Sequence, residues 1–371
     1  MENMVSPAAN PWHGRRVFLT GHTGFKGSWL ALWLASRGAR VRGYALDPIT
    51  QPNLFTAASG ANVLEDLRGD ICNLPRLQSS IIEFQPEVIF HLAAQPLVRR
   101  SYVDPLGTYA TNVLGTANVL ECVRKAPTVR AVVCITTDKC YQPAASLRAH
   151  PETDPLGGND PYSSSKACAE IVTAAYRSSF FPVERLADHR VAIATVRAGN
   201  VIGGGDWSQD RLIPDLIRGF DAGQQVLIRH PKAIRPWQHV LEPLHGYMLV
   251  AEQLLQGKPE FASAFNFGPN AGDAWPVECI AEKLSSLWGN GASWTCHEDS
   301  SIKEAPFLML DSSKAHTALH WQPRLGIESA LGWVVDWYKA WRQGEPMKEK
   351  TQDQITAYEQ LLAAPALTAK S

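Results

Sequence analysis

The sequence has almost no net charge, because its 35 lysine and arginine residues are balanced by 36 aspartate and glutamate residues. Such a chain has no overall field that would attract nucleic acid or an anionic membrane. We therefore expect neither as a partner. Any anionic ligand must be held by a few local groups.

Paired cysteines and long apolar runs are also missing. The seven cysteines are an odd number without a CxxC pair, which argues against a disulfide framework and a zinc site. No stretch is apolar and long enough to span a membrane, and residues 1–14 lack the basic region and apolar run of a secretion signal. We expect a cytoplasmic protein with no targeting segment and no metal centre.

The order of segments predicts the fold class. The first half of the 371 residues alternates β-branched runs with longer amphipathic segments, which predicts parallel strands joined by crossover helices. The prediction is an α/β fold with a doubly wound parallel Rossmann sheet, whose ligand lies at the carboxyl ends of the strands. We expect strands at 16–20, 40–45, 63–67, 88–92, 129–136 and 191–198, and helices at 26–37, 74–84, 104–125 and 161–180.

After about residue 200 the sequence changes to segments rich in Gly, Trp and Pro, such as Gly203-Gly204-Gly205-Asp206-Trp207. We expect residues 1–199 to form the Rossmann domain, with a return of 239–268 to it. Residues 200–371 should form a smaller, mixed α/β, substrate-binding domain with a helix at 328–342. The last 25 or so residues are polar and rich in Ala, and we expect a loosely held tail.

The first expected strand runs directly into Gly21-His22-Thr23-Gly24-Phe25-Lys26-Gly27. Gly21 permits a tight turn, Gly24 lets backbone amides approach a pyrophosphate, and Gly27 lets the helix pack close to the sheet. The amino terminus of the helix offers unpaired N–H groups to phosphates. The loop predicts an NAD-binding domain with cofactor contacts from Gly21, Thr23, Gly24, Phe25, Lys26 and Gly27.

Two carboxylates follow at strand ends. Asp47 can accept hydrogen bonds from the adenosine ribose and repel a 2′-phosphate, which favours NAD over NADP. Asp70 and Ile71, just past the third strand, are placed to meet the adenine. The simpler alternatives are that Asp47 caps the next loop and that Asp70 is a turn aspartate.

The strongest chemical signal is Tyr162-Ser163-Ser164-Ser165-Lys166, because residues four apart on a helix share a face. A tyrosine, with an ordinary pKa of about 10, becomes a usable base where the charge of Lys166 stabilises its phenolate. The preceding strand ends in Ile135-Thr136-Thr137-Asp138-Lys139, and Thr136 is expected to orient the substrate oxygen. Asn112 supports a water or a main-chain kink near Lys166, or is an ordinary interior residue of its helix.

Residues 14 to 345 resemble the extended short-chain dehydrogenase/reductases that act on nucleotide sugars, the NAD-dependent epimerase/dehydratase family. The resemblance rests on the glycine loop, the Tyr162 and Lys166 pair, His91-Leu92-Ala93-Ala94 and Arg197-Ala198-Gly199-Asn200-Val201-Ile202-Gly203. It implies that Ala93, Ala94, Gln95 and Asn112 also contact NAD. Five strings are similar to the CDP-glucose 4,6-dehydratase group within the family: residues 21–29, 94–99, 137–141, 203–207 and 235–240.

The resemblance implies a redox-neutral reaction on CDP-glucose in deoxysugar biosynthesis, as for the O-antigen of lipopolysaccharide. Oxidation at carbon 4, with Tyr162 taking the proton, is followed by loss of water across carbons 5 and 6 and by hydride return to carbon 6. Asp138, beside Thr137, is implied as the acid for the departing hydroxyl. Lys139 is either a neutral base at carbon 5 or a cation that stabilises the enolate. A solvent-facing charged loop is the alternative for Asp138 and Lys139.

A sugar diphosphate suits arginine, whose paired N–H donors clamp phosphates. The resemblance implies that Arg235 and Asn200 hold the diphosphate. Further substrate contacts are expected from Gln95, Arg99, Arg211, Arg229 and His239, with surface salt bridges or structural roles as the alternatives for the arginines and Gln95.

One segment departs from the family pattern. Residues 142–150 contain no Trp or Tyr, although this stretch usually contains both in the family. The identity of the hexose and of the nucleotide base of the substrate is therefore in doubt. A different nucleotide-sugar 4,6-dehydratase, a 4-epimerase and a non-catalytic dinucleotide sensor therefore stay open. Helices 104–125 and 161–180 carry more aliphatic residues than one sheet face covers, and in relatives this pair builds a four-helix interface, so we expect a homodimer.

Overall fold

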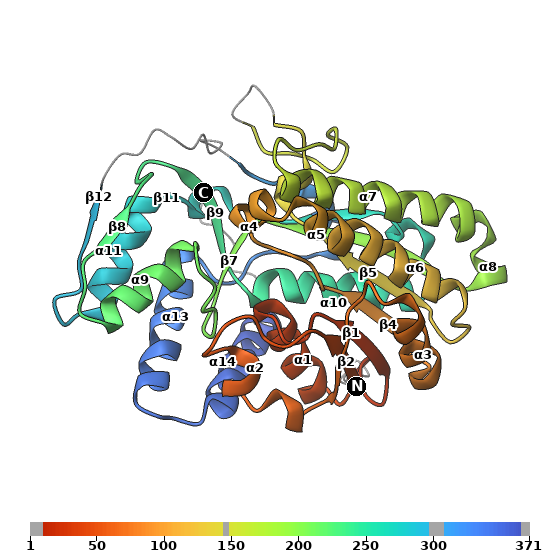
Figure 1. Cartoon of the computed structure of the whole chain (residues 1–371), viewed down its shortest axis with the longest axis horizontal. Coiled ribbons are helices and arrows are strands. Elements are labelled where there is room, and N and C mark those ends of the chain that lie inside the picture. The colour runs from red at the N-terminus through yellow and green to blue at the C-terminus, as the bar shows by residue number, and fades with distance from the viewer. Residues whose placement is uncertain (1–9, 144–147, 297–307, 365–371) are drawn as a thin grey trace, which may run out of the picture.

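The computed structural model describes residues 10–143, 148–296 and 308–364. Its centre is a sheet of seven parallel strands in the order β10-β6-β5-β4-β1-β2-β3 (Figure 1). The predicted α/β fold class is confirmed. The strands are β1 Arg16–Thr20, β2 Arg40–Ala45, β3 Glu65–Arg68, β4 Val88–His91, β5 Ala131–Ile135, β6 Ala192–Ala198 and β10 Ala264–Phe267.

The sheet has one strand more than the six expected. β10 comes from the segment that was predicted to return to the Rossmann domain, and it pairs with β6. The domain boundary at residue 199 stays a prediction.

Helices cover both faces of the sheet because successive side chains of a strand point to opposite faces. Val17 and Leu19 of β1 belong to one apolar cluster, whereas Phe18 belongs to the other. The first cluster includes α1 and α10, and the second includes α3 and α6. The helices of this part are α1 Phe25–Ser36, α2 Leu54–Ala57, α3 Leu74–Phe84, α4 Val98–Val103, α5 Pro105–Tyr109, α6 Gly115–Arg124, α7 Pro161–Phe180, α8 Leu186–His189 and α10 Leu241–Leu255.

The expected helix 104–125 is interrupted. A π-helical turn, Ala110–Leu114, separates α5 from α6. Such turns occur mostly as single insertions within helices and are frequent at functional sites. Asn112 lies in this turn, which agrees with the kink that was one of its alternatives.

A smaller lobe lies beside one end of the sheet (Figure 1). It contains a three-stranded sheet, β11-β9-β7, and a two-stranded sheet, β12-β8. Its strands are β7 Asn200–Ile202, β8 Val226–Ile228, β9 Ile234–His239, β11 Ala274–Pro276 and β12 Trp294–Cys296, and its helices are α9 Leu212–Asp221, α11 Val277–Trp288 and α13 Ile327–Arg342. A further helix, α12 Ser313–Leu319, contacts α10 and β10 of the Rossmann part.

The expectation of a loosely held tail is wrong for most of that segment. Residues Met347–Ala363 form α14, which contacts α1 of the Rossmann part. Met347 and Tyr358 are buried, and the Trp33 indole N–H donates to Glu359 Oε1 at 2.7 Å. The composition is polar because one face meets water, but the buried face is apolar enough to hold the helix. Residues 365–371 lie outside the described part.

In the described ranges no helix is both long and apolar enough to cross a bilayer. All seven cysteines are free thiols. Residues 1–9, on which most of the expectation about a targeting segment rests, lie outside the described part.

Candidate active site

The glycine loop between β1 and α1 is closely packed against its neighbours. Gly21 has a φ of +78°, and a Cβ atom there would lie 2.6 Å from the backbone nitrogen of Ala93. A Cβ atom at Gly27 would lie 2.1 Å from the carbonyl oxygen of Gly21. No larger residue fits at either position. Gly24 is the N-cap of α1, and no acidic side chain stands in the first turn, so the backbone N–H groups there can donate hydrogen bonds to an anion.

The other predicted cofactor residues near the loop contact neighbouring parts of the protein. The Thr23 hydroxyl donates to the carbonyl of Leu46 at 2.9 Å, so it holds the loop to the end of β2. The Phe25 ring lies against Gly203 of the smaller lobe. Ala93 borders Gly21, and Ala94 follows it half-buried. The residues present therefore fit a dinucleotide phosphate site built from backbone groups.

The residues predicted to contact the adenosine differ in their exposure and hydrogen bonding. Asp47 is 88% exposed at the end of β2, with Oδ1 at 3.5 Å from Arg68 Nε. Asp70 Oδ1 accepts the backbone N–H of Cys72 at 2.8 Å, which is the hydrogen bond of the turn alternative. The Ile71 side chain is buried against Gly115. The Ile71 side chain therefore serves the core, and the predicted contact of Asp70 and Ile71 with adenine stays a prediction.

The tyrosine and lysine that were predicted to be catalytic lie in the first turns of α7, at the carboxyl edge of the sheet. Asp160 caps this helix by accepting the Ser163 N–H at 2.9 Å, and Pro161 occupies the first helical position. Both Tyr162 and Lys166 are buried, at 8% and 7% exposure. The helix therefore begins where it brings both groups inside the protein.

Burial dominates the electrostatics of this pair. It raises the pKa of Tyr162 to about 12, opposed by a hydrogen bond with Thr137 and by the charge of Arg211. Burial lowers the pKa of Lys166 to about 8. The Lys166 ammonium donates to the carbonyl of Ile135 at 3.2 Å, at the end of β5. Stabilisation of the phenolate by Lys166 stays a prediction.

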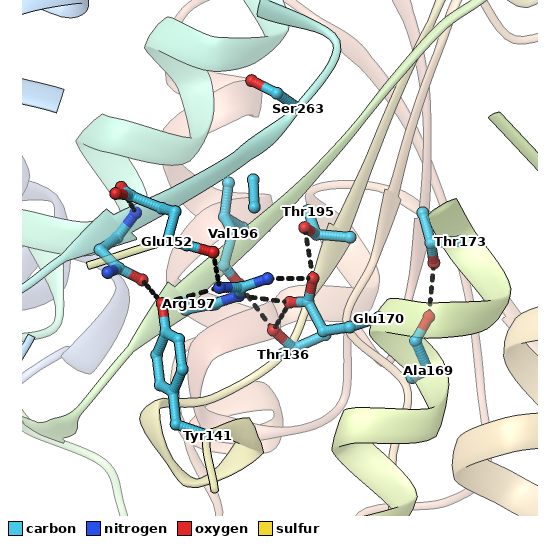
Figure 2. Close-up of polar contacts among 12 residues, drawn as sticks. Thr136, Tyr141, Glu152, Ala169, Glu170, Thr173, Thr195, Val196, Arg197 and Ser263 are labelled. Atoms are coloured by element: carbon cyan, nitrogen blue, oxygen red, sulfur yellow. Dashed lines mark hydrogen bonds and ion pairs between the residues drawn. The ribbon is translucent and has the colours of Figure 1, made fainter. Parts of the chain in front are cut away.

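Thr136 does not face this site. Figure 2 shows its hydroxyl directed at Glu170, to which it donates a hydrogen bond. The hydroxyl beside Tyr162 belongs to Thr137, whose Oγ1 also donates to Asp138 Oδ1 at 2.9 Å. The expectation that Thr136 orients the substrate oxygen is therefore corrected, because side chains alternate at the end of a strand and Thr136 turns into the protein.

The carboxylate of Glu170 is the centre of a buried network that sequence reasoning missed. Arg197 donates to both of its oxygens, from Nε at 2.9 Å and from Nη2 at 2.8 Å (Figure 2). The Thr195 hydroxyl donates at 2.7 Å, and Arg197 Nη1 also donates to the Tyr141 hydroxyl at 2.7 Å. Although burial acts to raise the pKa of Glu170, these donors hold it below its ordinary value.

This network fixes α7 to the sheet. Glu170 lies one helical turn after Lys166, and Arg197 lies on β6. A signal was present in the sequence, because Tyr162, Lys166 and Glu170 repeat at a spacing of four, which places them on one face. Arg197 was quoted as part of a family string but was assigned no role.

Asn112 connects the loop after β4 to α7. Its Nδ2 donates to the carbonyl of Gln95 at 3.1 Å and to Ser165 Oγ at 2.8 Å, and its Oδ1 accepts the Gln95 N–H at 2.8 Å. The Gln95 side chain bonds in turn to Leu97 and Thr108. These bonds match the structural alternative for Gln95, and its contacts with the sugar and with NAD stay predictions.

Asp138 has a free oxygen inside the site. The residue is 2% exposed, and Oδ2 has no hydrogen-bond partner within the described ranges. This oxygen faces the backbone at Gly199, where a Cβ atom would lie 3.1 Å from it. The alternative of a solvent-facing loop is thus excluded for Asp138. Lys139, the next residue of the same short 3-10 turn, is half-buried.

The predicted substrate residues are brought together only in part. Arg211 pairs with Asp206 at 2.9 Å, and it is close enough to lower the pKa of Tyr162. Asn200 and Arg235 lie half-buried on β7 and β9 of the same small sheet. In this sheet Asn200 is in register with Trp237, so Arg235, two residues earlier, shares its face.

The remaining candidates have surroundings that match other roles or show no contact. Arg99 forms an exposed salt bridge with Asp210 at 2.8 Å, which is its structural alternative. Arg229 is exposed after β8. His239 is wrong as a substrate contact: it is fully buried between Trp29 and Trp333. Burial lowers its pKa to about 3, so it is a neutral core residue.

Two further groups border the centre. Lys26 Nζ is 3.5 Å from the hydroxyl of Tyr247, a fully buried residue of α10. Tyr247 was not predicted, because nothing in an apolar helix marks one tyrosine as part of a distant site. Among the residues that the structure describes, no three or more His, Cys, Asp or Glu gather as a metal site.

Known proteins resemble this chain over most of its length. The family model for the NAD dependent epimerase/dehydratase family matches residues 17–268. A CDP-glucose 4,6-dehydratase from Salmonella typhimurium is 52% identical, over 94% of this chain and 97% of the relative.

Solved structures share the fold. A dTDP-glucose 4,6-dehydratase from Streptomyces venezuelae with NAD bound has a TM-score of 0.74 at 23% identity, over 90% of this chain and 99% of that one. MoeE5 in complex with UDP-glucose and NAD has a TM-score of 0.73 at 25% identity, over 88% and 99%. The chain belongs to the NAD dependent epimerase/dehydratase family.

Proposed function

We propose that the chain is an NAD-dependent hydro-lyase that converts CDP-glucose to CDP-4-keto-6-deoxyglucose with loss of water. The observation that carries the proposal is the Thr137 hydroxyl, which donates to Asp138 Oδ1 at 2.9 Å and lies near enough to Tyr162 to lower its pKa. It joins a group suited to oxidation at carbon 4 and a group suited to elimination at carbon 6. The similarity to the Salmonella typhimurium CDP-glucose 4,6-dehydratase supports the choice of substrate.

The glycine loop would hold NAD through the backbone amides at the start of α1, with Gly21 and Gly27 providing the close approach. Bound NAD supplies a reversible hydride acceptor. The protein binds, orients and moves protons around it.

Tyr162 takes the proton of the sugar 4-hydroxyl. Its buried phenol needs help to ionise, and the Thr137 hydroxyl and the charge of Arg211 both act in that direction. Lys166, fixed to the end of β5 by the carbonyl of Ile135, holds positive charge one turn along the same helix face.

Elimination uses the turn that follows β5. Asp138 turns its free oxygen into the site and protonates the departing 6-hydroxyl. Lys139 acts at carbon 5, either as the base or as the cation that stabilises the enolate. The substrate diphosphate is held by Arg235 and Asn200, which share one face of the small sheet.

We also propose a homodimer, in the cytoplasm, formed by a four-helix bundle. Large apolar side chains are exposed along the helices that would form it, and on a monomer they would meet water. They are Leu106 at 81%, Leu114 at 62%, Ile171 at 55% and Phe180 at 43%, and the adjoining α4 adds Tyr102 at 66% and Val103 at 86%. The product would enter deoxysugar biosynthesis, as for an O-antigen.

The test is incubation of the purified protein and NAD with a panel of CDP-, dTDP- and UDP-hexoses, followed by mass analysis. Loss of one water from CDP-glucose, with no net NADH, is the expected result. An unchanged mass with inversion at carbon 4 would identify a 4-epimerase. Water loss from another sugar nucleotide would change the substrate, and NAD binding without turnover on any member would identify a sensor.

A further inference from the structure

The part of the cofactor site that was predicted to hold the adenosine also contains an arginine, Arg68. It is the last residue of β3, and Asp47 follows β2, the strand beside it in the sheet. The two strands are parallel, so both residues lie at the carboxyl edge, where the glycine loop also begins. Thr23 of that loop donates to the carbonyl of Leu46, the residue before Asp47, at 2.9 Å. Arg68 therefore lies beside the expected place of the ribose.

Each of the three guanidinium nitrogens of Arg68 faces a different oxygen. Nη2 donates to Asp66 Oδ2 at 2.9 Å, and Nη1 donates to the carbonyl of Leu46 at 3.3 Å. Asp66 is itself held in place, because its Oδ1 bonds to the fully buried His22 at 2.8 Å. These contacts fix the guanidinium group so that its Nε faces Asp47 Oδ1 at 3.5 Å.

The two carboxylates around Arg68 differ in their exposure. Asp66 is half-buried, whereas Asp47 is 88% exposed. Asp47 can therefore meet a ligand on one side while its charge meets Arg68 on the other. A carboxylate at this place accepts hydrogen bonds from the hydroxyls of a ribose. It also occupies the donor of Arg68 that would suit a phosphate, since a fixed guanidinium is a good phosphate ligand.

We propose that Arg68 and Asp47 together select the cofactor at the adenosine end of the site. Arg68 is a positioning residue that holds the Asp47 carboxylate at the ribose, and Asp47 in turn keeps Arg68 from binding a 2′-phosphate. Without Asp47, Arg68 would accept NADP, whose ribose carries that phosphate. The proposal rests on the predicted ribose contact of Asp47. It goes beyond the proposed function, because it does not depend on which sugar nucleotide is dehydrated.

The test measures the dissociation constants of NAD and NADP by fluorescence titration of the full chain, without a sugar nucleotide and at one ionic strength. The wild-type protein should bind NAD more tightly than NADP by a factor of about 10². Asp47→Ser should weaken NAD about tenfold and tighten NADP about tenfold, as expected for one hydrogen bond to a charged group. Arg68→Met should weaken NAD about threefold and leave NADP weak.

The double variant Asp47→Ser with Arg68→Met distinguishes this arrangement from an ordinary surface ion pair. The tighter binding of NADP to Asp47→Ser should disappear in the double variant, because the donor for the phosphate is gone. Asp188→Ser is the matched control. It breaks the exposed pair of Arg185 and Asp188, which precedes β6 at the opposite edge of the sheet, and should change both constants by less than about twofold.

A competition measurement needs only the exposed position 47, where a substitution leaves the core intact. Adenosine 2′,5′-bisphosphate differs from adenosine 5′-monophosphate only by the 2′-phosphate. The bisphosphate should displace NAD from Asp47→Ser at the lower concentration, and the monophosphate should do so from the wild-type protein. Equal NADP binding by Asp47→Ser and by the double variant, or no gain of NADP binding in Asp47→Ser, would overturn the proposal. These constants are independent of the dehydration assay.

Discussion

The buried ion pair between Glu170 and Arg197 leads to a prediction about stability. The two side chains are 3% and 4% exposed, and Glu170 accepts four hydrogen bonds, from Arg197, Thr136 and Thr195. Removing one partner of a buried pair leaves the other charge uncompensated, which costs about 3–5 kcal/mol of folding free energy. Glu170→Gln keeps the shape and leaves the Arg197 charge without its counter-ion.

The expected loss is near the lower end of that range, about 3 kcal/mol. Arg197 keeps two other partners, because its guanidinium lies 4.9 Å from the centre of the Tyr141 ring and also donates to the carbonyl of Glu152. Equilibrium urea unfolding, followed by circular dichroism at one protein concentration, gives the number. The matched control is Asp188→Asn, which breaks the exposed pair between Arg185 and Asp188. Its effect should be below about 1 kcal/mol.

Two further results would test the reasoning. The double variant Glu170→Met with Arg197→Met should be more stable than Glu170→Gln, because it leaves no charge behind. The pKa of Glu170 is lowered in the folded protein, so its stabilisation is present above the unfolded value of about 4.3 and is lost as pH falls through the folded pKa. Glu170→Gln should flatten that acid dependence. A free energy of unfolding within 1 kcal/mol of the Asp188→Asn value would refute the account.

Three other predictions concern the site and the assembly. Tyr162→Phe should lower kcat by at least about 10² in the dehydration assay, since it removes the phenol whose pKa Thr137 and Arg211 lower, and normal turnover would remove Tyr162 from the chemistry. Because burial lowers the pKa of Lys166 to about 8, the cationic form is lost as pH rises through that value; kcat should fall there, and a flat profile up to pH 9 would contradict this role. Leu106→Glu, at an 81% exposed position, should give a monomer by light scattering, whereas Leu227→Glu, at a 53% exposed position of the smaller lobe, should not; an unchanged dimer in both would place the interface elsewhere.

The regular part of the fold could be predicted from the sequence because its signals are local. The strand before the glycine loop and the helix that begins at Pro161 have the predicted bounds. The C-terminal helix could not be predicted this way. Its polar composition hides a buried face whose partners, Trp33 and Glu242, are far away in the sequence.

In the candidate site, too, the predictions that rest on local spacing agree with the structure, and some of the others do not. The spacing of Tyr162 and Lys166 fixes their common face, and the glycine spacing fixes the loop. It is harder to predict which of two neighbouring residues at a strand end faces the site, because Thr136 and Thr137 differ by one position and point to opposite sides. His239 was misplaced for a different reason: its string resembles the family, but Trp29 and Trp333, which are far from it in the sequence, enclose its ring in the core.

The network at Glu170 also connects the catalytic helix to the segment that departs from the family pattern. Tyr141 bonds to Arg197 and to Asn266 of β10, and the His150 ring stacks on the Tyr141 ring at 4.8 Å. The two ends of the departing segment, on either side of residues 144–147 outside the described part, are thus attached to the ion pair that holds α7. Tyr162 and Lys166 lie on the helix that Glu170 and Arg197 hold, so their position depends on that ion pair. A change of residues within the departing segment that keeps Tyr141 and His150 should therefore leave Tyr162 and Lys166 in place.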